Sequence, residues 1–374
     1  MDLTIIRNAD IYSPEHLGTR DVLIGGGRIL SVDERIDSIQ GAREIDAEGE
    51  ILEPGLVDGH VHIIGGGGEN GMLSRVPPLR EEKIVKAGVT SLVGLLGTDG
   101  YTRTVRDLVA KCKAINEYGL FCRCLTGSYQ IPSPTITGDV GDDIIYIDEV
   151  IGVKIAVSDH RCSLPTTAEL LRLATTVRLA SLMSRKAGVV HIHVGAAESG
   201  IEQLFEIADT TPLPIKHFYP THMEGHPEQC VEWLSRGGHI DLTCKKNLGP
   251  LIDRLLDINE ENLTLSTDSN GSFPMWNEKK EIIGMGAGDI LNLRNTIDNL
   301  IYDEGMDRTK ILSLCTRNAA RANRMTGRGE IREGNYADLV LRDGRKLRHV
   351  IASGQFMMED GRIKESMYRN SFEI

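Results

Sequence analysis

Short runs of alternating apolar and polar residues occur near both ends of the chain. Near the N-terminus they are Leu3–Arg7, Val22–Ile24 and Arg28–Val32. Near the C-terminus they are Asp338–Leu341, His349–Ala352 and Gln355–Met358. Alternation with period two is typical of strands, and a glycine turn such as Gly25–Gly27 indicates a hairpin. We therefore predict that residues 1–52 and 335–374 pair into one small β-sandwich domain.

Between these ends, residues 53–334 alternate strand-like apolar runs with longer helical patterns. The eight apolar runs are Gly55–His62, Ser91–Gly97, Phe121–Gly127, Gly152–Val157, Val189–Val194, His217–His222, His239–Thr243 and Leu263–Thr267. The helical patterns between them are Glu81–Ala87, Val105–Glu117, Ala168–Ser184, Ile201–Asp209, Gln229–Arg236 and Pro250–Leu256. Strands that alternate with helices predict a parallel sheet, and the number eight predicts a closed (β/α)8 barrel. The alternative is an open doubly wound sheet, but that fold usually begins with a glycine-rich phosphate turn. The first run here ends in His-x-His instead.

The composition argues against two kinds of partner. The chain of 374 residues has 42 Lys and Arg against 54 Asp and Glu, which gives a formal net charge of −12. Nonspecific binding of nucleic acid needs basic surface, so we expect no nucleic-acid partner. No stretch has the apolar length that spans a bilayer, and the first residues have no signal-peptide pattern. We therefore expect no membrane partner and a cytoplasmic location.

Seven cysteines are scattered along the chain, and none forms a C-x-x-C pair. This pattern predicts reduced thiols. Cys122 and Cys124 lie two apart in an apolar run, so they are expected to share one face of a strand. We predict that they pack there and bind no metal.

Four consecutive glycines, Gly65–Gly68, follow the first apolar run and are followed by Glu69. A phosphate-binding loop would continue with Lys-Ser or Lys-Thr instead. Two interpretations stay open from the residues alone. The segment is either a flexible loop or a loop whose backbone must approach a ligand closely.

Residues able to bind a metal lie on, or end, several of the predicted barrel strands. They are His60 and His62 on the first strand, Lys154 on the fourth, His191 and His193 on the fifth, His222 on the sixth and Asp268 on the eighth. Active sites of such barrels lie at the carboxyl ends of the strands, so we predict one metal site there. Imidazole and carboxylate ligands favour zinc. Lys154 has two interpretations: a buried lysine paired with a carboxylate, or a carbamylated lysine whose two oxygens bridge two ions.

Six longer segments carry a family resemblance. They read GLVDGHVHIIGGGGE, VTSLVGLLGTD, LTGSYQIPSPTITG, IGVKIAVSDHR, YPTHMEG and LTLSTDSNGS. In this order and spacing they resemble the isoaspartyl (β-aspartyl) dipeptidases of the amidohydrolase superfamily over essentially the whole chain. The C-terminal GEIREGNYADLVL resembles the returning β domain of many amidohydrolases.

The resemblance implies a site with two zinc ions. The ligands would be His60, His62 and Asp268 at the more buried ion, and His193 and His222 at the other. Carbamylated Lys154 and a hydroxide would bridge the two ions. His191 has no role in the family pattern and would be structural.

The resemblance also implies a set of substrate contacts. Glu69 would hold the α-amino group of the substrate, Tyr129 would polarise the scissile carbonyl, and Arg161 would grip a substrate carboxylate. The remaining contacts would come from Gly67, Thr98 and Ser272.

The chain departs from the family pattern at one position. The family has an arginine three residues after the sixth-strand histidine, and Gly225 occupies that place here. A clamp for the carboxylate of the leaving group is therefore missing, or another residue supplies it. His226 and Lys245 are the two candidates, and the sequence does not choose between them.

The implied activity is that of a zinc-dependent metallopeptidase, an omega peptidase that hydrolyses the isopeptide bond of β-aspartyl dipeptides. A metal-bridging hydroxide would be the nucleophile, and Asp268 would be the general acid and base. The family forms octamers, so the resemblance also implies a homo-oligomer that binds a small dipeptide. One alternative is another amidohydrolase that acts on cyclic amides or N-acyl amino acids without needing Glu69 or Arg161. A second is a non-catalytic amidohydrolase-like scaffold, which would be expected to lose metal ligands.

Overall fold

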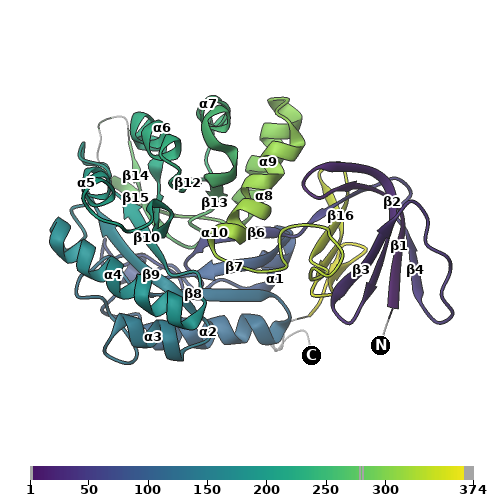
Figure 1. Ribbon diagram of the computed structural model, residues 1–374, viewed down its shortest axis with the longest axis horizontal. Coiled ribbons are helices and arrows are strands. Elements are labelled where there is room, and N and C mark those ends of the chain that lie inside the picture. Colours follow the sequence, from purple (N-terminus) through teal and green to yellow (C-terminus); the bar gives the residue numbers. More distant parts are fainter. Residues whose placement is uncertain (1–2, 278, 280–281, 366–374) are drawn as a thin grey trace.

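The computed structural model describes residues 3–277, 279 and 282–365. Figure 1 shows two parts: parallel strands surrounded by helices, and a β-sheet part at one side that contains strands from both ends of the chain. Among the described residues, no helix is long and apolar enough to cross a membrane.

Eight parallel strands form the larger part. They are β6 (Leu56–Val61), β7 (Val89–Gly94), β8 (Phe121–Gly127), β9 (Val150–Val157), β10 (Val189–Val194), β11 (Phe218–Thr221), β12 (Ile240–Thr243) and β13 (Leu263–Ser266). Each overlaps one of the eight predicted runs, with ends that differ by up to three residues in β7. Strands β6 to β11 form one sheet in chain order, and β12 and β13 form a pair.

Polar contacts join this pair to both edges of the six-stranded sheet. After β13, the carbonyl oxygen of Ser269 accepts a hydrogen bond of 2.8 Å from the backbone N–H of His62, which follows β6. At the other edge, the Thr221 hydroxyl of β11 donates to the Asp241 carboxylate of β12 at 2.7 Å. These contacts bring the last strand back to the first, and the predicted (β/α)8 fold is confirmed.

Helices follow the strands and cover the outside of the barrel (Figure 1). They are α1 (Glu81–Lys86), α2 (Val105–Tyr118), α3 (Val140–Tyr146), α4 (Thr167–Ser184), α5 (Glu202–Thr210), α6 (Pro227–Ser235), α7 (Gly249–Asn259), α8 (Leu291–Asp298), α9 (Arg308–Leu314) and α10 (Arg317–Ala322). Shorter 3-10 or π-helical turns lie at Met72–Ser74, Ile215–His217, Met223–Gly225, Glu260–Asn262 and Asn299–Asp303. The longest helix, α4, begins with a capping box in which Thr166 and Glu169 satisfy each other's backbone N–H groups. The sequence pattern predicted six of these helices and missed α3, α8, α9 and α10.

The second part is a nine-stranded sheet with strands from both ends of the chain. Its strands are β1 (Leu3–Tyr12), β2 (His16–Gly25), β3 (Arg28–Asp33), β4 (Arg43–Asp46), β5 (Ile51–Pro54), β16 (Leu339–Asp343), β17 (Lys346–Ala352), β18 (Gln355–Glu359) and β19 (Arg362–Ile363). Strand β16 pairs antiparallel with β5, which leads directly into the barrel. The exact domain boundaries stay a prediction, and residues 1–2 and 366–374 of the predicted small domain lie outside the described residues.

A buried ion cluster joins the sheet to a barrel helix. The Glu53 carboxylate of β5 is fully buried and accepts hydrogen bonds from Arg294 of α8 and, at 3.2 Å, from Arg342 of β16. Arg342 also donates to Asp298 of α8 at 2.5 Å. Each of these buried charges has an oppositely charged partner, as burial of charge requires.

Two segments near the carboxyl ends of the strands differ from the sequence expectation. The hairpin formed by β14 (Ser272–Trp276) and β15 (Ile282–Ala287) follows β13 and was not predicted. In the glycine run, a Cβ on Gly65 would lie 2.0 Å from the Val76 carbonyl oxygen, and a Cβ on Gly67 would lie 2.5 Å from that of Ser74. The close backbone approach at these glycines is therefore to the chain's own loop.

Candidate active site

The predicted metal-binding side chains come together at the carboxyl ends of the barrel strands. His60 lies on β6, Lys154 on β9 and His193 on β10. His62 directly follows β6, His222 directly follows β11, and Asp268 lies two residues after β13. Five strands thus contribute to one centre.

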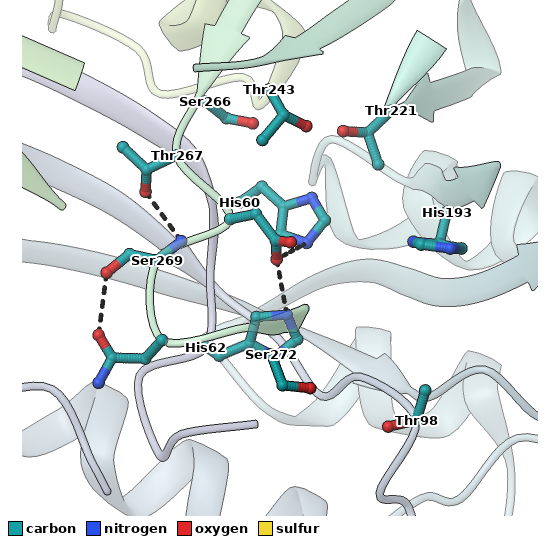
Figure 2. Close-up of polar contacts among 12 residues, drawn as sticks. His60, His62, Thr98, His193, Thr221, Thr243, Ser266, Thr267, Ser269 and Ser272 are labelled. Carbon is teal, nitrogen blue, oxygen red and sulfur yellow. Dashed lines mark hydrogen bonds and ion pairs between the residues drawn. The ribbon is translucent and has the colours of Figure 1, made fainter. Parts of the chain in front are cut away.

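One carboxylate oxygen contacts two histidine rings of this centre. The Oδ1 atom of Asp268 lies 3.0 Å from Nε2 of His62 and 3.2 Å from Nε2 of His60. In Figure 2, dashed lines mark these contacts at the labelled rings of His60 and His62. Ligand atoms of His60, His222 and Asp268 all lie within 4.8 Å of one another. Such a group of two imidazoles and a carboxylate is a ligand set that suits zinc.

The electrostatics favour cation binding. Burial lowers the pKa of the His60 imidazole to about 3 and that of His193 to about 4, so both rings are neutral near pH 7. Burial alone would raise the pKa of the Asp268 carboxyl, but hydrogen bonds from His60 and His62 hold it well below its usual value. Neutral imidazole and ionised carboxylate are the forms that bind metals.

Lys154 lies fully buried in the same centre. Its Nζ atom has no hydrogen-bond partner among the described residues, and neither does the buried Nε2 of His222. Burial lowers the pKa of the Lys154 ammonium to about 7. A buried amine that is largely neutral near physiological pH can react with CO₂ to form a carbamate. The unpaired Nζ of Lys154 and Nε2 of His222 are therefore consistent with a centre in which a lysine carbamate and this histidine bind metal ions.

Two outer contacts orient the ligands. Nε2 of His193 donates to the Asp159 carboxylate at 2.8 Å. This contact leaves Nδ1, which lies 2.6 Å from the Tyr129 hydroxyl in this structure, as the nitrogen available to a metal. Nδ1 of His222 lies 2.7 Å from the Thr243 hydroxyl. Contacts of this kind fix the tautomer and the direction of a metal-binding histidine.

His191 makes a contact of the same kind. Its Nε2 lies 3.1 Å from Nδ1 of His60, and both rings are buried. If His60 donates its Nδ1–H to His191, Nε2 of His60 keeps the lone pair that a metal needs. This arrangement agrees with the expected structural role of His191.

The predicted substrate contacts line one small cavity beside the metal-binding centre. The Glu69 carboxylate accepts hydrogen bonds from the hydroxyls of Thr98 at 2.8 Å and Ser272 at 2.9 Å. Gly67, Tyr129 and Arg161 line the same cavity, which ends at Asp268. Six residues from five separate segments of the chain thus line one pocket.

Two cavity residues have electrostatic settings that favour substrate binding. Arg161 makes two hydrogen bonds to Asp159, of 3.0 and 2.7 Å, and lies 3.5 Å from Glu69. Its guanidinium is therefore held toward the cavity. Burial raises the pKa of the Tyr129 hydroxyl well above its usual value, so the group stays protonated and can donate a hydrogen bond.

The two candidate replacements for the missing arginine, His226 and Lys245, lie in different surroundings. The His226 ring donates from Nε2 to the carbonyl oxygen of Gly195 at 2.9 Å. Lys245 pairs with Glu224 at 3.2 Å and lines a second, larger cavity together with His222 and Asp268. Of the two, only Lys245 lines this cavity.

The sequence interpretation assigned no role to Asp159 or Thr243. Asp159 lies inside the quoted segment IGVKIAVSDHR, two residues before Arg161, so the segment gave a signal for it. Thr243 ends β12, and nothing in its sequence context indicates that it contacts His222.

Comparisons with known proteins agree with this geometry. The family model described as "Amidohydrolase family" matches residues 51–368. A crystal structure of a β-aspartyl dipeptidase from Fervidobacterium islandicum AW-1, in complex with β-Asp-Leu dipeptide, is 39% identical. It covers 98% of this chain and 100% of that chain with a TM-score of 0.92. A dihydropyrimidinase from Brevibacillus agri NCHU1002, at 14% identity and a TM-score of 0.69, covers 96% of each chain and shares the fold.

The curated relatives have other activities. An adenine deaminase from Bacillus licheniformis is 37% identical over 353 residues, which are 90% of this chain and 54% of the relative. An L-hydantoinase from Paenarthrobacter aurescens is 27% identical over 163 residues, which are 41% of this chain and 35% of the relative. The chain spans about half the length of the adenine deaminases that it matches.

Proposed function

This chain belongs to the amidohydrolase family, and we propose that it is a zinc-dependent peptidase that hydrolyses the isopeptide bond of β-aspartyl dipeptides. The resemblance to β-aspartyl dipeptidases is confirmed by two solved structures at 39% and 38% identity. The family and these neighbours support a hydrolase, and the His/Asp group agrees with a metal-dependent one.

The position of Glu69 carries the substrate assignment. Its carboxylate lies in the cavity that ends at Asp268, between the hydroxyls of Thr98 and Ser272 and within 3.5 Å of Arg161. A β-linked aspartyl residue presents both a free α-amino group and a free α-carboxylate. Glu69 and Arg161 offer one charge of each sign, so the pair matches both ends of this residue.

The metal centre would use the ligands that the family resemblance implies, three of which, His60, His222 and Asp268, lie close enough together to hold an ion. One ion would be held by His60, His62 and Asp268, and the other by His193 and His222, with carbamylated Lys154 between them. When bound, zinc lowers the pKa of water to about 7 and so supplies hydroxide at neutral pH.

The side chains around the centre would complete the reaction. The Tyr129 hydroxyl donates a hydrogen bond to the oxyanion that develops from the scissile carbonyl. Asp268 accepts the proton of the nucleophile and passes it to the leaving amine, which must be protonated to depart. The products are aspartate and the released amino acid.

The main alternative is a hydrolase or deaminase that acts on a ring. The adenine deaminase, hydantoinase and dihydroorotase relatives favour this class. Such a substrate needs the metal ligands but offers no free α-amino group to Glu69. The presence of Glu69 beside Arg161 therefore favours the β-aspartyl substrate.

The test compares two substrates that share one amide bond. β-Asp-Leu and succinyl-leucine differ only in the α-amino group, so we expect kcat/KM for succinyl-leucine to be roughly 100-fold lower. Glu69→Gln should remove most of this preference, whereas the exposed Glu198→Gln is the matched control and should keep it. Equal rates on both substrates with the unaltered enzyme would contradict the role of Glu69.

A further inference from the structure

A second cavity opens on the other side of Asp268. Its volume is about 810 Å³, against about 40 Å³ for the cavity that contains Glu69. Among their lining residues the two cavities share only Asp268. A substrate whose aspartyl end lay beside Glu69 and whose scissile bond lay at Asp268 would therefore have its leaving group next to the larger cavity.

The volume of the larger cavity is greater than one amino-acid residue occupies. A cavity of roughly 150 Å³ already holds benzene, and pockets of about 300–1,000 Å³ hold drug-sized ligands. A volume near 810 Å³ therefore has room for several residues after the scissile bond.

One wall of this cavity carries carboxamides at helical spacing. Asn292, Asn295 and Asn299 lie three and four positions apart on α8 and the turn that follows, so they share one helix face. The side chains of Asn292 and Asn295 form no hydrogen bond with any described residue, while Asn299 donates to Glu304 at 2.7 Å. Carboxamides both donate and accept hydrogen bonds, as a peptide backbone requires.

Where the family has an arginine, this chain has Gly225, which has no side chain to contact a leaving group. A Cβ on Gly225 would have no neighbouring heavy atom within 4 Å. Lys245 lines the cavity, but half of its side chain is exposed and its ammonium pairs with Glu224. Lys246 and Glu304 also line the cavity, and both are exposed. None of these three charges is buried, so none requires the leaving group to end after one residue.

We infer that the enzyme also removes the β-aspartyl residue from tripeptides and longer peptides, whose remaining residues occupy this cavity. The inference rests on the proposed function. Water adds across the same isopeptide bond: the C–N bond breaks, the aspartyl carbonyl becomes a carboxylate, and the amine of the released peptide takes the proton.

The experiment uses the metal-loaded full chain with β-Asp-Leu, β-Asp-Leu-Gly and β-Asp-Leu-Gly-Gly, and identifies products by mass spectrometry. We expect free aspartate plus intact Leu-Gly or Leu-Gly-Gly, with kcat/KM within about tenfold of that for β-Asp-Leu. Cleavage of β-Asp-Leu alone would overturn the inference and leave the proposed function standing. Cleavage of none of the three, with metals bound, would overturn both.

A bulky substitution in the wall tests where the extension lies. Asn295→Trp should lower the ratio of tripeptide to dipeptide kcat/KM by about tenfold or more, because the added ring occupies space that only the longer substrate needs. Asp257→Trp adds the same side chain at an exposed position of α7 outside the cavity and should leave the ratio unaltered. An unaltered ratio in Asn295→Trp would overturn the assignment of this cavity.

Discussion

The Oδ1 atom of Asp268 lies 3.0 Å from Nε2 of His62, although 206 residues separate them in the sequence. The contact forms because the backbone after β13 meets the backbone after β6, where the His62 N–H donates to the Ser269 carbonyl oxygen. Asp268 itself has a φ of 50°, which turns its side chain toward the centre. Closure of the barrel therefore positions the proposed acid–base group.

Asp268→Asn should lower kcat by roughly 10²- to 10⁴-fold, the usual contribution of a general acid–base group. An amide can still lie beside His60 and His62 but cannot carry a proton. The measurement is the turnover of β-Asp-Leu by a variant whose metal content has been determined. Turnover close to that of the unaltered enzyme, with metals bound, would exclude the proton-transfer role.

The unaltered protein should bind about two metal ions per chain, and Lys154→Ala should lose metal and activity together. The substitution removes the group whose carbamate would join the ions, and a short carboxylic acid should restore part of both. Elemental analysis and turnover are the readouts, with Lys310→Ala as an exposed control. Full metal content and normal turnover in Lys154→Ala would refute the bridging role.

Lys154 should also give the metal-free protein a pH-dependent stability. Its pKa is about 7 in the folded protein against an ordinary value of 10.5, so the unfolded chain binds the extra proton between these values. Stability therefore rises with pH in this window, by up to about 1.4 kcal/mol per pH unit. Below it, both states carry the proton.

Urea unfolding of the metal-free protein between about pH 7 and pH 8, below the ordinary thiol pKa of about 8.5, tests this expectation. Lys154→Met lacks the titrating amine, so the free energy of unfolding should rise less with pH in this variant than in the unaltered protein. Parallel curves for the two proteins would show that Lys154 does not titrate as described.

The leaving-group carboxylate should contribute little to recognition. β-Asp-Leu and its C-terminal amide should have kcat/KM values within about tenfold, because an exposed ion pair contributes only about 0–1 kcal/mol. Lys245, which is half exposed and already paired with Glu224, is the only one of the two candidate clamps that borders the cavity. A preference of about a thousandfold for the free acid would show that a strong clamp exists.

The sequence predicted the parts of the fold that have local signals. Each barrel strand is a short apolar run, and the ligands His60, His62, His193 and His222 lie at or next to strand ends. The rule that such ends meet at one face was therefore enough to group them. The role of Lys154 was open from the residues alone, because a lone lysine in an apolar run does not reveal its burial.

The features that the sequence did not predict depend on contacts between distant segments. The role of Asp159 depends on the direction of the His193 ring across two strands. The larger cavity has walls from β12, the loop before α7, and α8, whose helical pattern was missed. The hairpin after Asp268 carries exposed apolar residues such as Phe273 and Met275, so no buried stripe marks its strands.

The substrate assignment is tested by the kcat/KM of the metal-loaded protein for six compounds under one set of conditions: β-Asp-Leu, α-Asp-Leu, N-acetyl-leucine, dihydroorotate, hydantoin and adenine. We expect β-Asp-Leu to have the highest value by at least roughly 100-fold, because only in this substrate are a free amine for Glu69 and a free carboxylate for Arg161 on the same carbon, one methylene from the scissile carbonyl. No cleavage of β-Asp-Leu with both metals bound, accompanied by turnover of a cyclic amide, an acyl amino acid or adenine, would contradict it.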